Sequence, residues 1–366
     1  MPRTPLHEAE TESRAAFGDV DGWEMPKVFA NIKAEYLAGK GTVAAADRSH
    51  FGRLRLTGAK RLDLLHRITT NHVKALGPGH GAETVMCTDK GRIVDDLFVY
   101  ADEAAATLVT SPNMAAAVKE AIEKVRFRDD VQIEDVTAST AMITLFGPES
   151  GRLLDWLART SVKETKLHHW RRVQVEGVEV TAARTSGIGG GGFNLIMEAA
   201  SGNVVWRTIF KEGESYGVNP MGAEAMEMLR VEFGVPGFGR ELTEEFNPLE
   251  ARLNDAVHWD KGCYTGQEVI NRLDSRQKVQ RLLAGFLVDR GGVPEPRSRV
   301  FIGSDEVGVI TSVVPSLDLR GIIALGYIRT AHDAPGTRVE IKSAGDMIGA
   351  EVAAVPFKAK GHGPAP

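Results

Sequence analysis

The amino-acid sequence predicts an α+β fold that ends in a separate small β-barrel. Before Val279, segments with strand and helix patterns follow one another without the regular βαβ alternation of a doubly wound sheet. Beyond Val279, short alternating runs are separated by Gly, Pro, Asp and Ser, which is typical of a barrel. A chain of 366 residues is also too long for one compact core, so we expect two or three domains.

The first predicted elements are a strand and a helix. "RLRLTG" (Arg53 to Gly58) alternates like a half-buried strand, and residues 59–68 place Leu62, Leu65 and Ile68 on one helical face. The same patterns predict a helix at 114–126, after the N-cap region Ser111-Pro112-Asn113, and strands at 92–100, 106–110, 141–146, 172–176 and 178–183. The expected barrel strands are 282–288, 299–302, 307–314, 322–328, 338–341 and 350–357.

Composition excludes several classes of protein. The chain is 43% hydrophobic and 25% charged, which is ordinary for a globular protein, so global disorder is not expected. The formal net charge is -5 with basic residues spread along the chain, which gives no reason to expect duplex nucleic-acid binding.

Cysteine usage and apolar runs indicate the compartment. Cys87 and Cys263 are far apart and outside any CxxC pair, so a disulfide scaffold and a structural zinc site are not expected. The charged N-terminus has no signal-peptide pattern, and the apolar run Gly321 to Ile328 is too short to span a membrane. We expect a soluble, cytoplasmic protein without a membrane partner.

A glycine-rich run at Gly187 to Gly192, "GIGGGG", satisfies the GxGxxG pattern of a dinucleotide loop. Such a loop opens into a helix, whereas the following "FNLIMEA" alternates like a strand. A phosphate-binding loop would need a following Gly-Lys-Ser or Gly-Lys-Thr, which is absent. We therefore expect a turn between strands.

Two adjacent acids, Asp95 and Asp96, interrupt the apolar strand "IVDDLFVY". Neighbouring side chains of a strand point to opposite faces, so one of the two faces inward. A buried carboxylate is costly without a donor or cation, which favours an acid, a base or a ligand anchor in a cleft. The alternative is one solvated acid and one that caps a turn.

Arg230 shares the apolar stripe of a helix in "GAEAMEMLRVEFG". It either pairs with Glu227 at the surface or points inward to anchor a buried carboxylate or a ligand. His168 and His169 are adjacent and point apart, so they do not predict a metal site.

The stretch "DKGCYTGQEV" at 260–269 holds one of the two cysteines. Cys263 is either a buried small hydrophobe or a reactive thiol. Lys261 favours the second alternative because a nearby cation lowers a thiol pKa, and Gly262 and Gly266 allow close approach.

Several stretches in series resemble the glycine cleavage T-protein superfamily, the tetrahydrofolate-dependent aminomethyltransferases, and within it the YgfZ-like folate-binding proteins. They are "FGDVDGWEMP", "DRSHFGRLRLTG", "TTNHV", "MCTDKGRIVDDLFVY", "RVEFGVPGFGREL" and "NPLEARL", in the family's order. The resemblance runs from about Thr4 to Phe357. It implies two intertwined mixed α/β lobes within residues 1–270, a β-barrel over 279–357 and a flexible tail at 358–366, arranged around a central folate cavity.

The resemblance also implies roles for individual residues. Asp96 matches the acid set against the reactive folate nitrogens, where it would stabilise a cationic one-carbon species or shuttle its proton. Asn113 and Arg230 match positions near the folate. Asn194 stands where the family acid that holds the pterin is expected, in "GGGGFN" for "GEDGFE", and an amide does not offer two charged acceptor oxygens.

The cysteine stretch is the second departure from the T-proteins. "KGCYTGQE" is the signature of the YgfZ-like branch, whose members are linked to folate-dependent maintenance of iron–sulfur proteins. The resemblance makes Cys263 the functional thiol, surrounded by the motif residues Lys261, Gly262, Tyr264, Gly266, Gln267 and Glu268.

The leading hypothesis is therefore a YgfZ-like protein that binds tetrahydrofolate, or its 5,10-methylene or 5-methyl derivative, and supports iron–sulfur client or assembly proteins, with or without one-carbon transfer. One alternative is a tetrahydrofolate-dependent aminomethyltransferase or demethylase. A catalytically silent interaction module with the same fold is the other.

Overall fold

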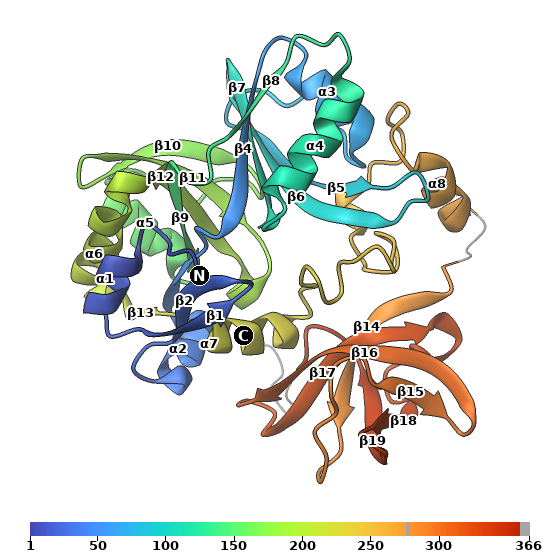
Figure 1. Ribbon diagram of the computed structural model, residues 1–366. Helices are drawn as coiled ribbons and strands as arrows, with labels where there is room; N and C mark the ends of the chain where they lie inside the picture. The colour runs from blue at the N-terminus through green and yellow to red at the C-terminus, as the bar shows by residue number, and fades with distance from the viewer. Residues whose placement is uncertain (276–278, 359–366) are drawn as a thin grey trace. The chain divides into compact units, whose positions relative to one another are not determined.

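The computed structural model describes residues 1–275 and 279–358 (Figure 1). Contacts divide the chain into two compact units, each built from separate stretches of sequence. The first unit contains Met1–Cys87, Asp95–Met226 and Asp255–Thr265; the second contains Thr88–Val94, Glu227–Asn254 and the chain from Gly266 onward. The expected domain boundaries at residues 270 and 279 stay a prediction, and the expected tail lies, from residue 359, outside the described residues.

The first unit contains a six-stranded sheet in the order β10-β11-β12-β9-β3-β13. Its strands are β3 (Val43–Asp47), β9 (Thr140–Phe146), β10 (Trp170–Val175), β11 (Val178–Thr185), β12 (Gly192–Glu198) and β13 (Val218–Pro220). Its accompanying helices are α1 (His7–Glu12), α2 (Ile32–Gly41), α5 (Ser150–Ala158) and α6 (Gly202–Glu212). Leu154 of α5 and Trp206 of α6 are fully buried in one core with Ile143 and Leu195 of the sheet, so these two helices cover one of its faces.

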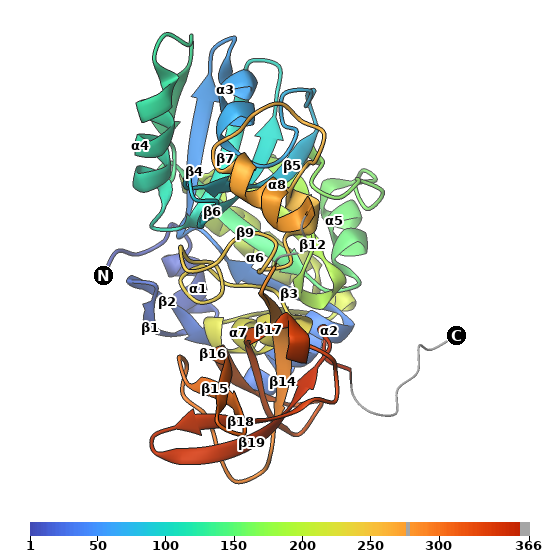
Figure 2. The same cartoon turned by 90° about the vertical axis from the view of Figure 1, so that its right-hand side faces the viewer.

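A five-stranded sheet follows the order β5-β6-β7-β4-β8. It is formed by β4 (Phe51–Thr57), β5 (Gly81–Cys87), β6 (Ile93–Ala101), β7 (Ala105–Pro112) and β8 (Gln132–Asp135), with α3 (Arg61–Ile68) and α4 (Ala115–Arg126) packed together beside it (Figure 2). The predicted strand at Arg53 and the two predicted helices are confirmed to within two residues. In α3 the face is turned slightly from the expected one, because Leu64, Leu65 and Ile68 are buried whereas Leu62 is half-buried.

The two sheets of the first unit share a buried cluster. Tyr100 and Val109 of the five-stranded sheet pack with Met142, Ala183 and Ile196 of the six-stranded sheet. Side chains of β6 that point the same way as Tyr100 therefore face the other sheet. A short hairpin, β1 (Ala16–Val20) and β2 (Trp23–Val28), also belongs to this unit.

The glycine-rich run forms the connection between the antiparallel strands β11 and β12. Gly187, Gly189, Gly190 and Gly191 have positive φ, and a Cβ on Gly189 would lie 2.3 Å from the carbonyl oxygen of Gly39. A strand follows the run, so the predicted turn between strands is confirmed.

The second unit contains a closed six-stranded barrel in the order β14-β17-β16-β15-β18-β19. Its strands are β14 (Arg281–Val288), β15 (Arg299–Ile302), β16 (Asp305–Ser316), β17 (Gly321–Arg329), β18 (Arg338–Ser343) and β19 (Asp346–Ala353). Strict alternation in β18 buries Val339 and Ile341 in the barrel core beside Phe286 and Ile310. The predicted C-terminal barrel is confirmed, and the fold is two mixed α/β lobes followed by a barrel.

The remaining elements are short or connect the two units. They are α7 (Ala223–Phe233), α8 (Gln267–Ser275) and the 3-10 turns η1 (Ile188–Gly190), η2 (Ala199–Ser201), η3 (Glu214–Tyr216), η4 (Asn254–Ala256) and η5 (Thr330–His332). Within residues 1–275 and 279–358, every helix is too short or too polar to cross a bilayer.

Candidate functional site

The two adjacent acids of β6 have different surroundings. Asp95 is fully buried, with Leu97 on its face, and its carboxylate accepts hydrogen bonds from the backbone N–H of Asp96 at 2.9 Å and of Ser111 at 3.1 Å. Asp96 is half-buried and faces the six-stranded sheet with Tyr100. The fully buried acid is thus Asp95, whereas the family resemblance singled out Asp96.

Asp96 forms an acid pair with Glu83 of the neighbouring strand β5. Burial raises the pKa of both carboxyls, that of Glu83 to about 7, and the charge of Asp255 raises the pKa of Glu83 further. A hydrogen bond between the two carboxyls needs one of them protonated, so the pair keeps a proton near neutral pH. Asp96 Oδ1 is shielded from solvent and has no hydrogen-bond partner.

A histidine completes this acidic group. His168 Nε2 lies 3.5 Å from Glu83 Oε2, and its ring centroid lies 5.7 Å from that of Phe98. Burial, followed by the charge of His169, lowers the pKa of His168 to about 4, so its imidazole is neutral at pH 7. Its Nδ1 is also shielded and without a partner. The site therefore presents an acid pair and a neutral imidazole with two unmet polar atoms.

Asn194 links the two sheets at this site. Its carbonyl oxygen accepts from the Thr144 hydroxyl at 2.7 Å, and its amide nitrogen donates to the Tyr100 hydroxyl at 3.4 Å. Burial raises the pKa of Tyr100 to about 12, so this phenol stays protonated. The structure thus brings Asp96 and Asn194 into the same space between the sheets, and both amide atoms of Asn194 already have partners.

Asn113 lies in a left-handed backbone conformation just after β7, with φ of 63°. Its amide nitrogen donates to the Asp21 carbonyl at 2.7 Å, and its amide oxygen accepts from Trp23 Nε1 at 3.0 Å. These bonds tie it to the β1–β2 turn. A direct role in ligand binding stays a prediction.

Lys261 stabilises the fold of the first unit. Its ammonium donates to the carbonyl oxygens of His66, Thr69 and Asn71 at 2.6, 2.5 and 2.7 Å, at the C-terminal end of α3. Burial lowers the pKa of Lys261 to about 7. The expectation that this cation activates Cys263 stays a prediction.

Cys263 is exposed and Cys87 is buried, so the first alternative for Cys263, a buried hydrophobe, is wrong. The following Tyr264 is buried, its ring lies 4.9 Å from Lys261 Nζ, and its hydroxyl has no hydrogen-bond partner. Gly262 has open space around its α-carbon.

The rest of the motif belongs to the second unit. Gly266 has φ of +84°, and a Cβ there would lie 2.6 Å from the Thr88 carbonyl oxygen, so only glycine fits. Gln267 and Glu268 begin α8. Their predicted part in the surroundings of the thiol stays a prediction.

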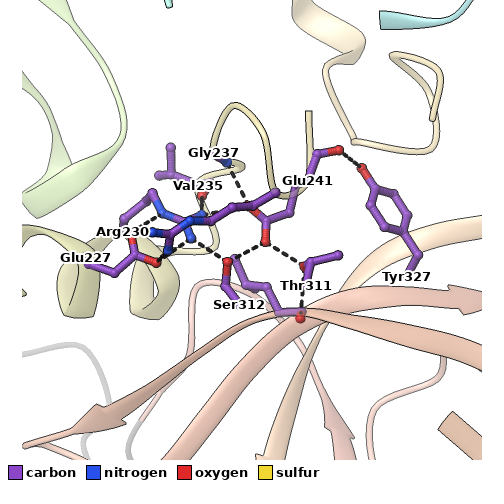
Figure 3. A network of polar contacts seen from close by, with 10 residues as sticks. Glu227, Arg230, Val235, Gly237, Glu241, Thr311, Ser312 and Tyr327 are labelled. Carbon is purple, nitrogen blue, oxygen red and sulfur yellow. Dashed lines mark hydrogen bonds and ion pairs between the residues drawn. The ribbon is translucent and has the colours of Figure 1, made fainter. Parts of the chain in front are cut away.

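Arg230 fulfils both alternatives that its sequence position left open. Its Nε and Nη2 bond Glu227 at 2.8 and 2.7 Å, Nη1 bonds the Val235 carbonyl at 2.6 Å and Glu241 at 2.9 Å, and Nη2 also donates to Ser312 Oγ at 2.6 Å (Figure 3). All five N–H groups of the guanidinium are used in these bonds. Its predicted contact with folate would require one of them to break.

Glu241 is the buried carboxylate that Arg230 anchors. Its side chain is fully buried and also accepts from the Gly237 N–H at 2.8 Å, Thr311 Oγ1 at 2.5 Å and Ser312 Oγ at 2.7 Å. The network fixes the 234–242 loop against the barrel strand β16.

Sequence reasoning missed Glu83, Tyr100 and Asp255, and it set His168 aside with the rejected metal site. Glu83 lies in the strand before the acid pair, where a cross-strand partner for Asp96 could have been sought. Within the part of the chain that the structure describes, no three His, Cys, Asp or Glu side chains are arranged to hold a metal ion.

Two facing sheets followed by a closed C-terminal barrel define the class of this protein as a three-lobed α+β protein. Two family descriptions match the chain: the GCVT N-terminal domain over residues 6–261 and the glycine cleavage T-protein C-terminal barrel domain over residues 281–358. The chain belongs to the glycine cleavage T-protein family.

Known relatives support the same assignment. Proteins named aminomethyltransferase are 31% identical over 359 residues in Saccharopolyspora erythraea and 32% identical over 360 residues in Shouchella clausii, in each case over 97% of both chains. The crystal structure of the glycine cleavage system aminomethyltransferase T from Bartonella henselae superimposes with a TM-score of 0.87 at 23% identity, over 97% of this chain and 98% of that one. At this identity the structural likeness establishes the fold.

Proposed function

We propose that this protein is a tetrahydrofolate-dependent one-carbon transferase whose acid–base centre is the Asp96–Glu83 pair. The observation that carries the proposal is the unmet, shielded Asp96 Oδ1 in a pair that holds one proton near neutral pH. Aminomethyltransferase relatives that extend over nearly the whole chain favour this class of reaction.

The residues between the sheets fit a ligand of this kind. Asp96 Oδ1 and His168 Nδ1 are shielded polar atoms without partners, and the Phe98 ring lies beside His168. Bound tetrahydrofolate would supply the nitrogen atoms that carry the one-carbon unit. The acid pair exchanges a proton at neutral pH, and the negative charge that remains on the pair stabilises positive charge that develops beside it.

Asn194 bears on the choice of donor. Its amide oxygen is hydrogen-bonded to Thr144 and its amide nitrogen to Tyr100. Asn194 therefore does not offer a pterin ring the two acceptor oxygens that a carboxylate would offer. We propose that the pterin ring is recognised without this acid, and that the transferred group is either aminomethyl or methyl.

Binding and turnover test the proposal together. Tetrahydrofolate and its 5,10-methylene form are titrated into the wild type, Asp96→Asn and Cys263→Ala by calorimetry, and each protein is then assayed with aminomethyl and methyl donors. The proposal expects folate binding by the wild type, turnover that depends on Asp96, and unchanged turnover in Cys263→Ala. A wild type that binds neither folate contradicts it.

A second candidate is the YgfZ-like function in iron–sulfur protein maintenance. The observation that favours it is the exposed thiol of Cys263 within "KGCYTGQE". It predicts that Cys263 is alkylated faster than Cys87 and that folate protects it. It further predicts that Cys263→Ala fails to restore an iron–sulfur enzyme in cells lacking this protein, whereas the wild type restores it. Restoration by Cys263→Ala, or alkylation that folate does not change, contradicts this candidate.

A further inference from the structure

An open cavity of about 450 Å³ lies in the first unit between two loop segments, residues 78–80 and 164–171. The segments are joined by backbone hydrogen bonds, among them Trp170 N–H to the Gly79 carbonyl at 2.9 Å. The proposed one-carbon reaction does not use this cavity.

Adjacent histidines separate the cavity from the Asp96 site. His168 is directed towards Glu83 and Phe98, whereas His169 lines the cavity, with its ring centroid 4.5 Å from that of His80. The cavity is thus separate from the Asp96 site, because the two histidines before β10 are directed to different places.

Two cations, Lys166 and Arg171, line its wall beside the two imidazoles, and within the described residues neither cation makes an ion pair. Arg172, next in the chain, lies outside the lining and pairs with Asp102 and Glu179. Burial, followed by the charges of His80 and Lys166, lowers the pKa of His169, as expected where like charges gather. One acid, Glu164, lines the same wall.

Thr165 gives independent evidence for a ligand. Its side chain is 8% exposed, it lines the cavity, and its shielded Oγ1 has no hydrogen-bond partner. A buried hydroxyl without a partner costs about 1–3 kcal/mol, so a hydrogen-bonding ligand in the cavity would recover that free energy.

We propose that this cavity is a binding site for hydrogen phosphate. Lys166 and Arg171 provide the positive charge, the two imidazoles offer ring N–H groups, and the Thr165 hydroxyl donates to a phosphate oxygen. Glu164 would repel a fully ionised anion such as sulfate, but it accepts a hydrogen bond from the O–H that hydrogen phosphate carries. The site selects phosphate over sulfate for this reason.

The test follows the histidine ring protons of the whole chain by NMR at pH 7, while phosphate, sulfate, glycerol phosphate or chloride is added at constant ionic strength. Phosphate is expected to shift the His80 and His169 signals to saturation and to raise the pKa of His169. Sulfate and glycerol phosphate, which lack the acidic O–H in their main form, are expected to bind at least about tenfold more weakly, the loss of one charge-assisted hydrogen bond.

Matched variants identify the binding groups. Thr165→Val keeps the shape of the side chain and removes a hydroxyl that has no hydrogen-bond partner. The melting temperature of the protein without phosphate should therefore not fall, whereas its phosphate affinity should fall about tenfold. Lys166→Ala with Arg171→Ala should abolish saturable binding, and Arg172→Ala should leave it within about twofold. Linear, chloride-like shifts, equal affinity for sulfate, or no effect of Thr165→Val would overturn the proposal. A failure of folate turnover has no bearing on it, because the two sites share no residue.

Discussion

The Asp96–Glu83 pair and the Arg230–Glu241 pair are both buried acid networks, and they differ in completeness. Each N–H of Arg230 has an acceptor, and the Glu241 carboxylate receives four hydrogen bonds from Arg230, Gly237, Thr311 and Ser312. Asp96, in contrast, keeps one shielded oxygen without a donor, and its pKa is raised. A network that the protein completes by itself stabilises the fold, whereas an incomplete one is available to a ligand.

The largest effect is expected where the completed network is broken. Glu241→Ala removes the acceptor of four buried hydrogen bonds and leaves the buried Arg230 charge with Glu227 alone, so it should lower the free energy of unfolding by about 3–5 kcal/mol. Urea denaturation measures it. Arg240→Ala, which removes an exposed partner of Glu227, is the control and should cost less than about 1 kcal/mol. If both variants lost the same free energy of unfolding, the Arg230–Glu241 network would not be a special source of stability.

The incomplete network should respond in the opposite way. Asp96→Asn removes an acid that the fold does not satisfy, so the melting temperature of the unliganded protein should stay level or rise. Turnover should fall about 100-fold or more, which corresponds to about 2.7 kcal/mol of activation free energy. Thermal denaturation and initial rates check both parts. A variant that melts earlier and keeps its turnover would assign Asp96 to the fold.

Asp95 is a further buried acid, and the pH dependence of stability tests how it differs from the ion-paired Glu241. Burial raises the pKa of Asp95 from the ordinary 3.8 to about 7. The folded chain therefore keeps a proton that the unfolded chain releases, and the stabilisation present below pH 3.8 is lost as the pH rises towards about 7.

Its contribution to the free energy of unfolding is on the order of 4 kcal/mol, because each unit of pKa change corresponds to about 1.4 kcal/mol. Urea denaturation of the wild type and Asp95→Asn between pH 4 and about 8 isolates it as a difference in slope. Parallel profiles for the two proteins would show that Asp95 ionises normally.

The smallest effect concerns a single bridge in the completed network. Ser312 Oγ accepts from Arg230 Nη2 and donates to Glu241 Oε1, so Ser312→Ala should cost about 1 kcal/mol. Thr144→Val removes the donor to Asn194 in the other network and should change folate affinity more than stability. Denaturation and calorimetry on both variants give the comparison. If both variants changed stability and folate affinity to the same extent, the two networks would not differ in function.

Local periodicity was sufficient to predict much of the fold. Strand and helix positions such as 53–58 and 114–126 follow from their patterns, although the N-cap of α4 is Met114 and makes no side-chain cap, and the change in pattern near Val279 predicted the barrel. The faces of Asp95 and Asp96 could not be assigned, because β6 is apolar on both sides and a period of two then carries no direction.

The site was predicted less completely, for a related reason. Asp96 and Asn194 came from the family resemblance, whereas Glu83 joins Asp96 through strand pairing, which no local pattern encodes. The expected effect of Lys261 on Cys263 rests on their proximity in sequence and stays a prediction. The long side chain of Lys261 reaches three carbonyl oxygens near the end of α3, which no sequence pattern indicated.

This contact also constrains the order of events during synthesis. The first unit takes its last segment from Asp255–Thr265, where the Lys261 ammonium reaches α3 and the His258 N–H donates to the Thr70 carbonyl. At a ribosomal rate of about 5–20 residues per second, roughly ten seconds or more separate the emergence of α3 from that of Lys261. During that interval the carbonyls at the end of α3 lack their ammonium partner, so a nascent chain stopped before Lys261 cannot complete its first unit.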